Sequence, residues 1–180
     1  SKKLNSMKKL LLKSKLTKKL KKEDIESICK LKNTHWRYGI KSQINWFHKN
    51  MKDRDIHNLA YLNGKLVGYV SLRKRNFILN NKKKRYLYFD TLIVLKKYRN
   101  FEIGHKLLKL TVKVIKKSKL HSMLICKKKV VQFYEKYKWK KMIQNRIKII
   151  DHKYSKNLSM MCFNRTKQMS KVNIRYYIFS

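Results

Sequence analysis

The segment 86–108 constrains the fold more than any other part of this sequence. An apolar run from Tyr88 to Val94 leads through a short polar turn into a segment that begins with Ile103-Gly104 and has apolar residues at helical spacing. A strand, a tight turn and an amphipathic helix in this order point the N–H groups of the helix N-terminus at one spot. Such a spot binds phosphate, so the segment predicts an anion-binding unit.

Hydrophobic periodicity predicts the remaining elements. Acids at the start of 23–31 and apolar residues at helical spacing indicate a helix there, and a second helix is predicted over Ser42–Met51. Asn63-Gly64 between two apolar runs predicts a hairpin over 58–72. The sequence further predicts strands at 10–16, 85–94, 121–127, 139–150 and 157–163, a polar loop at 80–84, and helices at 102–117 and 130–137. This order predicts an α/β (α+β) fold with a mixed, mostly antiparallel sheet flanked by helices.

Length and composition predict one domain over residues 1–166 and a C-terminal extension at 167–180, in which 174–179 is a candidate added strand. The apolar runs are too short for a membrane-spanning helix, so no membrane insertion is expected. The three cysteines are scattered and lack the spacing of metal ligands. We therefore expect no metal site and a reducing, cytoplasmic location.

The formal net charge of +40 suggests a nucleic-acid or membrane partner. However, only nine of the 49 basic residues are arginine, which is the side chain best suited to reading bases. Lysine is spread over every segment, proline is absent, and both features are typical of a biased genome composition. We therefore favour a compositional origin of the charge and expect only nonspecific polyanion binding at low salt.

Two motifs carry a family resemblance. Arg99-x-x-x-x-Gly104 after the strand that ends at Val94 resembles the acyl-CoA loop of the GNAT (Gcn5-related) N-acetyltransferases, Gln/Arg-x-x-Gly-x-Gly/Ala, with Glu102 at the first glycine. Phe133-Tyr134 followed by Trp139 is similar to the family signature Phe/Leu-Tyr-x-x-x-Gly-Phe. Here Lys138 stands at the glycine, and Lys127 stands where the family often has Asn. The predicted element order is also that of the GNAT fold.

The resemblance implies acetyl-CoA as co-substrate and no metal. It assigns the pyrophosphate to the loop, and the thioester and pantetheine arm to backbone N–H groups of the preceding strand, which separates from its neighbour in this family. The implied acetyl-CoA-binding residues are Leu92, Ile93, Val94, Arg99, Asn100, Phe101, Glu102, Ile103, Gly104 and His105. The negative charge of Glu102 is unfavourable near phosphate unless its side chain turns outward, and we expect Lys96, Lys97 and Arg99 to offset it.

Tyr134 and Asp90 are the candidate catalytic residues. By resemblance, Tyr134 protonates the leaving thiolate; without the resemblance, a packing role beside Val130 is favoured. Asp90 is the single acid on its predicted strand, and either a general base or a structural carboxylate bonded to backbone fits it equally well. Cys126 is interpreted as a small core residue and not as a nucleophile.

The candidate segment for binding the acceptor of the acetyl group is Thr34-His35-Trp36-Arg37-Tyr38. Its mixture of aromatic rings and polar groups suits a sugar or nucleoside. His35, Trp36 and Tyr38 are therefore the candidate substrate-binding residues. The preferred function is N-acetylation of a small-molecule amine or amino sugar by direct transfer in a ternary complex, and a homodimer is left open. Two alternatives remain: a catalytically degenerate GNAT domain acting as a CoA-binding or scaffold module, and a basic nucleic-acid-binding protein.

Overall fold

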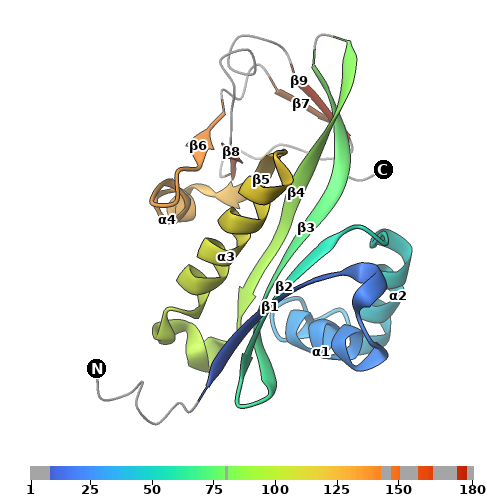
Figure 1. Ribbon diagram of the computed structural model, residues 1–180, viewed down its shortest axis with the longest axis vertical. Helices are drawn as coiled ribbons and strands as arrows, with labels where there is room; N and C mark the ends of the chain where they lie inside the picture. Colours follow the sequence, from blue (N-terminus) through green and yellow to red (C-terminus); the bar gives the residue numbers. More distant parts are fainter. Residues whose placement is uncertain (1–8, 80, 143–146, 151–157, 164–173, 178–180) are drawn as a thin grey trace. The chain divides into compact units, whose positions relative to one another are not determined.

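The computed structural model describes residues 9–79, 81–142, 147–150, 158–163 and 174–177 (Figure 1). The helices are α1 (Lys22–Asn33), α2 (Ile40–Asn50), α3 (Ile103–Ser118) and α4 (Val131–Glu135). The strands are β1 (Leu10–Leu16), β2 (Ile56–Leu62), β3 (Lys65–Leu79), β4 (Lys82–Val94), β5 (His121–Lys127), β6 (Lys140–Lys141), β7 (Ile147–Ile150), β8 (Leu158–Phe163) and β9 (Ile174–Tyr177).

Among the described residues, the strands follow the order β1-β2-β3-β4-β5-β8-β6 in one sheet. The pairs β1–β2, β2–β3, β5–β8 and β6–β8 are antiparallel, and β4–β5 is parallel. Strand β9 pairs with β3 and, in parallel, with β7. The structure therefore confirms the predicted fold class, a mixed, mostly antiparallel sheet flanked by helices.

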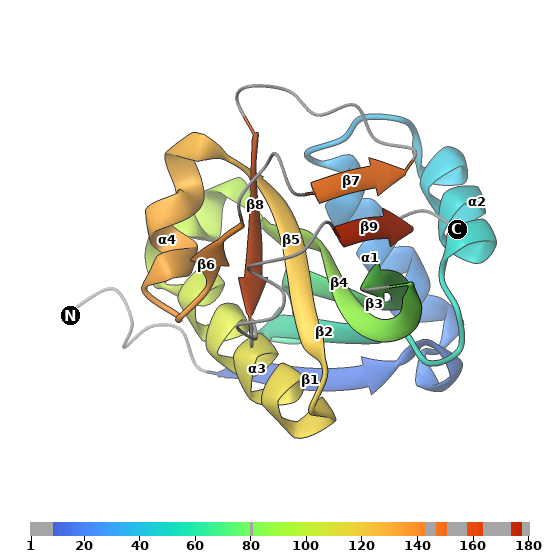
Figure 2. The ribbon, with the colours of Figure 1, turned by 90° about the horizontal axis from the view of Figure 1, so that it is seen from above.

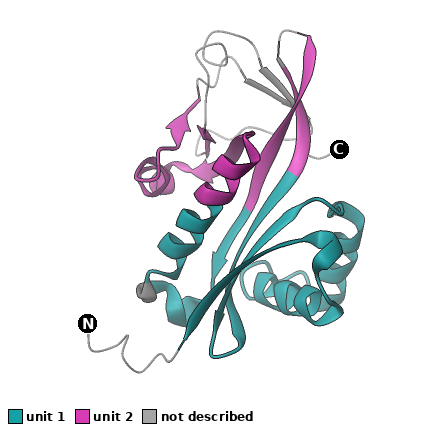
Figure 3. Ribbon diagram, in the orientation of Figure 1, with its two compact units in different colours: residues 1–73, 91–111 teal, residues 74–90, 112–180 magenta. Residues whose placement is uncertain are grey.

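Two compact units make up the chain (Figure 3). Unit 1 contains residues 1–73 and 91–111, and unit 2 contains residues 74–90 and 112–180. Strands β3 and β4 and helix α3 each contribute to both units. The assignment of residues 1–166 to one functional domain stays a prediction.

The core of unit 1 covers both faces of its strands. Ile28 of α1 and Phe47 of α2 are buried in one cluster with Leu59 and Tyr69 of the strands. On β3 the next residue before Tyr69, Gly68, faces the opposite way, and a Cβ there would lie only 2.7 Å from Leu107 Cδ1 of α3. Burial on both faces explains why β3 is almost continuously apolar where it crosses this unit.

The predicted hairpin is confirmed. Asn63 and Gly64 have φ angles of 50° and 78°, the two left-handed conformations of a type I′ turn. Leu62 pairs with Lys65 across the turn, and the register shifts at Ala60, where β3 carries one extra residue. Figure 2 shows β1 running beside β2 along the edge of this unit.

Unit 2 is organised around β5, which pairs with β4 on one side and with β8 on the other (Figure 2). Trp139 is only 1% exposed and forms the centre of an aromatic cluster. The rings of Phe89, Tyr134 and Phe163 lie 5.7, 6.2 and 5.5 Å from the Trp139 ring. This cluster fixes Tyr134 against β4 and β8 through large apolar contacts.

Several predicted boundaries were wrong. Strand β4 begins at Lys82, so residues 82–84 are strand and not loop; their side chains are exposed, which a strand tolerates. The predicted strand 139–150 is two strands, β6, which pairs with β8, and β7, which pairs with β9. Helix α4 is shorter than the predicted 130–137: Val130, with φ of −107° and ψ of 5°, is not helical, and the helix ends at Glu135, three residues before Lys138 with its φ of 68°.

The added strand predicted at 174–179 is confirmed for Ile174–Tyr177. Residues 178–179 lie outside the described residues, as do residue 157 of the predicted strand 157–163 and residues 143–146 of the predicted strand 139–150.

Candidate active site

Strands β4 and β5 part after Tyr88. Their parallel pairing joins Tyr86–Tyr88 to His121–Met123 only. Within unit 2, β4 continues through Asp90 and β5 through Lys127, and the described pairing of this last part of β5 is with β8. The separation is the one that the family resemblance implies, and it leaves edge backbone groups available to an extended ligand.

The segment that follows β4 has the predicted strand–turn–helix form. β4 ends at Val94, a 3₁₀ turn covers Lys96–Phe101, and α3 begins at Ile103. The Leu95 N–H donates to Val67 O at 2.8 Å, and the Lys106 N–H donates to Glu102 O at 3.0 Å as an early bond of the helix. The N-terminus of α3 presents N–H groups, among them those of Ile103 and Gly104, and a helix terminus of this kind can bind an anion.

Gly104 leaves room at this helix terminus. A Cβ at this position would meet only Val94 Cγ2, at 3.9 Å, which is an ordinary van der Waals distance. The backbone of Gly104 is helical, where glycine costs about 1 kcal/mol relative to alanine. The fold of this unit therefore does not require glycine here, and the open space fits the close approach of a phosphate group.

Glu102 and Lys138, which stand where the family has glycine, both adopt a backbone conformation that glycine favours. Glu102 has φ of 56° and Lys138 has φ of 68°, both in the left-handed region that glycine favours. At both positions the residue type differs from the family motif, but the backbone has a conformation that suits glycine.

Charge around the loop is predominantly positive. Lys96, Lys97 and Arg99 are exposed, and Arg99 Nε donates to Val94 O at 3.3 Å, which fixes its side chain against the end of β4. The Glu102 side chain is also exposed, so its charge is screened by solvent. The loop can accordingly offset the charge of a pyrophosphate.

Tyr134 is buried against aromatic rings, with Phe89 at 5.9 Å and Phe133 at 5.2 Å between ring centroids. Burial, and then the nearby Cys126, raise the pKa of Tyr134 well above its usual value, so the phenol is protonated at neutral pH. Burial also raises the pKa of Cys126 to about 11, so its sulfur is a thiol, as expected for a core residue.

The predicted site residues are distributed over both units. Unit 2 contains Tyr134 and Asp90, and Asp90 is half-buried on β4. Unit 1 contains the predicted acetyl-CoA-binding residues, of which Ile93 and Ile103 are buried, Leu92, Val94, Gly104 and His105 are half-buried, and Asn100 and Phe101 lie in the 3₁₀ turn.

The loop between α1 and α2 presents the predicted acceptor residues. Tyr38 is 72% exposed, His35 is exposed, and the rings of His35 and Trp36 meet edge to face at 4.6 Å. The Gln43 side chain donates to Trp36 O at 2.8 Å, and the Gly39 N–H donates to Asn33 Oδ1 at 2.9 Å. The loop is therefore held in place while Tyr38 extends into solvent.

Sequence reasoning missed a pocket of about 670 Å³ in unit 1. It lies between the last turns of α1, the β2–β3 turn and Leu95, the residue that follows β4. Thr34, which opens the α1–α2 loop, lines it together with Lys30 and Lys65. No local pattern could have revealed this site, because its residues come from three separate segments and lysine is common throughout the chain.

Two features are absent from the described residues. No group of three His, Cys, Asp or Glu side chains there is placed to hold a metal ion. Nor does any described helix combine the length and apolarity needed to span a membrane.

A family sequence model described as the Acetyltransferase (GNAT) family matches residues 22–139. Comparison with curated proteins gave no match. Among solved structures, the chain is similar to the GNAT family N-acetyltransferase YhbS from Escherichia coli in complex with CoA, with a TM-score of 0.67, 11% identity, and coverage of 93% of this chain and 89% of that chain.

Two further structures have the same fold. Escherichia coli ElaA has a TM-score of 0.64 and 11% identity, with coverage of 86% of this chain and 99% of that chain. An aminoglycoside 6'-N-acetyltransferase complexed with coenzyme A has a TM-score of 0.63 and 15% identity, with coverage of 84% of this chain and 96% of that chain. At these identities, the similarity shows the fold alone.

Proposed function

Because the chain belongs to the GNAT family of acetyltransferases, we propose that it transfers the acetyl group of acetyl-CoA to a primary amine. The acceptor in this proposal is a small molecule or an amino sugar, and transfer is direct, in a ternary complex. The observation that carries the proposal is the parting of β4 and β5 after Tyr88, which opens strand edge for an extended acyl donor. Solved relatives of this fold are described as CoA complexes, which supports the same donor.

The proposed donor site uses the loop and the end of β4. The pyrophosphate binds N–H groups of the first turn of α3, and Gly104 allows its close approach. Lys96, Lys97 and Arg99 offset its charge. Backbone N–H groups of Leu92 to Val94 bind the thioester carbonyl and the pantetheine arm, and one such donor to the developing oxyanion contributes about 3 kcal/mol.

In the proposed chemistry, the amine lone pair attacks the thioester carbonyl carbon and a tetrahedral oxyanion forms. As the C–S bond breaks, CoA leaves as a thiolate and takes the hydroxyl proton of Tyr134. Asp90 accepts the proton lost by the nitrogen, directly or through water. The raised pKa of Tyr134 means that this proton is present at neutral pH.

His35, Trp36 and Tyr38 contact the acceptor in this proposal, since the α1–α2 loop presents polar groups and an exposed ring to solvent. We assign the activity to residues 1–166 and propose a cytoplasmic location. None of the three cysteines, all of them described, forms a disulfide, which supports a reducing compartment.

Tyr134→Phe tests the chemistry. The variant keeps the ring contacts and loses the hydroxyl proton, so turnover is expected to fall by about 100-fold or more while acetyl-CoA affinity stays unchanged. Tyr137→Phe, three residues further along and half-buried, is the matched control and should retain activity. Equal turnover of wild type and Tyr134→Phe would remove Tyr134 from the mechanism.

The same assay distinguishes an active acetyltransferase from a catalytically degenerate GNAT domain. A CoA-binding or scaffold module would bind acetyl-CoA and acetylate no amine in a broad acceptor screen. The glycine-like backbone at Glu102 and Lys138 favours the catalytic form, because both motif conformations are retained.

A further inference from the structure

The pocket of about 670 Å³ in unit 1 has the build of a small-molecule site. Its apolar part includes Leu31 and Leu66, which are 3% and 7% exposed. Its walls join the start of the α1–α2 loop, at Thr34, to Leu95, directly after β4. The pocket thus lies between the two segments of this unit that the proposed function gives to the acceptor and to the thioester.

All charged side chains that line this pocket are cations. Lys30 of α1 and Lys65 of β3 are exposed at its rim, and no carboxylate occurs among the described residues that line it. The carbonyl groups at the end of α1 would repel an anion, but they are capped. Thr34 donates to Leu31 O through its N–H at 3.2 Å and its Oγ1 at 2.7 Å.

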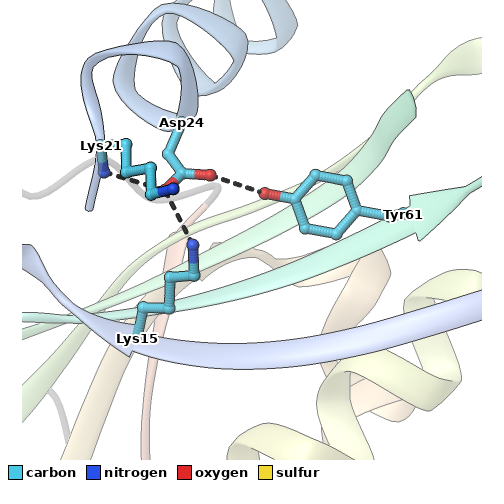
Figure 4. Close-up of polar contacts among 4 residues, drawn as sticks. All are labelled: Lys15, Lys21, Asp24 and Tyr61. Carbon is cyan, nitrogen blue, oxygen red and sulfur yellow. Dashed lines mark hydrogen bonds and ion pairs between the residues drawn. The ribbon is translucent and has the colours of Figure 1, made fainter. Parts of the chain in front are cut away.

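A second pocket of about 400 Å³ shares Asn63 and Gly64 with the first and extends the positive surface. It contains one carboxylate, Asp24, which accepts bonds from Lys15 Nζ at 2.8 Å, the Lys21 N–H at 2.9 Å and the Tyr61 hydroxyl at 3.1 Å (Figure 4).

The charge of Asp24 is therefore already compensated. Burial raises its pKa, but the bonds from Lys15, Lys21 and Tyr61 outweigh that effect and lower the pKa, so the group is ionised and paired. The other cations of the second pocket are Lys9 and Lys13.

We propose that the pocket lined by Lys30, Lys65 and Thr34 binds an anionic group of the acceptor, so that the acceptor is a small amine that also carries a phosphate or carboxylate. This inference rests on the proposed acetyl transfer. The same positive charges disfavour a polycationic amine such as an aminoglycoside.

The test compares matched probes on the full chain by calorimetry at about 0.15 M salt, where charges more than about 8 Å apart are screened. Glucosamine 6-phosphate and muramic acid are expected to bind at least about tenfold more tightly than glucosamine, and kanamycin is expected not to bind. The two acidic sugars separate a phosphate preference from a carboxylate preference.

Charge-reversal variants test whether Lys30 and Lys65 cause the preference for acidic sugars. Lys30→Glu and Lys65→Glu are each expected to reduce the preference for the acidic sugars by about tenfold. Lys41→Glu and Lys49→Glu, exposed on α2 and outside both pockets, change the net charge equally and should leave the preference intact. Equal losses in all four variants would overturn the proposal, since they would show a general charge effect.

Acetyl-CoA titration and turnover separate this inference from the proposed function. Loss of the preference for the acidic sugars in Lys30→Glu and Lys65→Glu, with acetyl-CoA affinity unchanged, supports the inference. Acetylation of glucosamine and glucosamine 6-phosphate with equal kcat/KM by the wild type overturns it and leaves the proposed function standing. Lysine-dependent binding of glucosamine 6-phosphate by a chain that does not bind acetyl-CoA overturns the acceptor assignment.

Discussion

Glu102 and Lys138 carry backbone strain at the two positions where the family has glycine. A non-glycine residue in the left-handed region costs roughly 1–2 kcal/mol. Glu102→Gly and Lys138→Gly are therefore each expected to raise the free energy of unfolding by about 1 kcal/mol, measured by urea denaturation. Glu102→Gly should also tighten acetyl-CoA binding, because it removes a negative charge from the phosphate loop.

Lys113→Gly is the matched control for these two substitutions. Lys113 is exposed within α3, where glycine is expected to lower the free energy of unfolding by about 1 kcal/mol. If Glu102→Gly and Lys138→Gly also destabilised the protein, the positions would not be strained in the way that their φ angles indicate.

His57 predicts a pH dependence of stability. It is fully buried, with one ring nitrogen 2.7 Å from Thr17 Oγ1 and the other 2.7 Å from the Tyr69 hydroxyl. Burial lowers its pKa from 6.5 to about 4, against the opposing charge of Asp55. As the pH falls, His57 takes up a proton in the unfolded chain before it does so in the folded protein, and this favours the unfolded state. The free energy of unfolding should therefore fall by about 3 kcal/mol as pH drops from 6.5 to about 4.

Urea denaturation at several pH values checks this expectation. His57→Gln lacks the titrating group and should show a flatter profile between pH 6.5 and 4, whereas His48→Gln, exposed on α2, should follow the wild type. Asp24 does not interfere, because its pKa is lowered from 3.8 and its contribution is lost below this window. Parallel profiles for all three proteins would contradict the assignment to His57.

At the scale of elements, the approach of β3 to α3 in unit 1 depends on Gly68. A Cβ there would lie 2.7 Å from Leu107 Cδ1 and 3.1 Å from Ile103 Cγ2. Gly68→Val is expected to lower the free energy of unfolding by about 1–3 kcal/mol through overpacking. Leu107→Ala also destabilises, but the double variant should lose less than the sum of both, measured by a double-mutant cycle. Strict additivity would show that the two side chains do not compete for this space.

Elements with local signals could be predicted from the sequence. The Asn63-Gly64 turn, strand β5 and helix α3 depend on neighbouring residues, and the structure has them at or within one residue of their predicted positions. The start of β4 was missed because Lys82–Lys84 is polar enough to suggest a loop. The pairing of β7 with β9 was missed because it joins segments far apart in the chain, which no local pattern encodes.

In the candidate site, too, features formed by consecutive residues could be predicted, and features formed by distant segments could not. The loop before α3 could be predicted because its residues are consecutive, and the motif with Tyr134 spans few residues. The lysine-lined pocket could not, since Lys30 and Lys65 become neighbours of one cavity only through packing of α1 on the β2–β3 hairpin. Among 49 basic residues, nothing in the sequence distinguishes these two.

At the scale of the whole molecule, the formal charge of +40 affects every binding measurement. Long-range attraction of this size binds polyanions without specificity and weakens steeply as salt rises. Coenzyme A is itself an anion, so a specific site is distinguished from general attraction only where the charges are screened.

Calorimetric titration with acetyl-CoA in about 0.3 M salt, where the Debye length is roughly 6 Å, tests the central claim most directly. We expect stoichiometric, micromolar binding that dephospho-CoA and inorganic polyphosphate do not match. Gly104→Val should abolish it, and Gly104→Ala, whose added Cβ makes only an ordinary van der Waals contact in the fold, should weaken it without loss of thermal stability. Binding that disappears with salt, or that polyphosphate reproduces, would contradict an acetyl-CoA site in this chain.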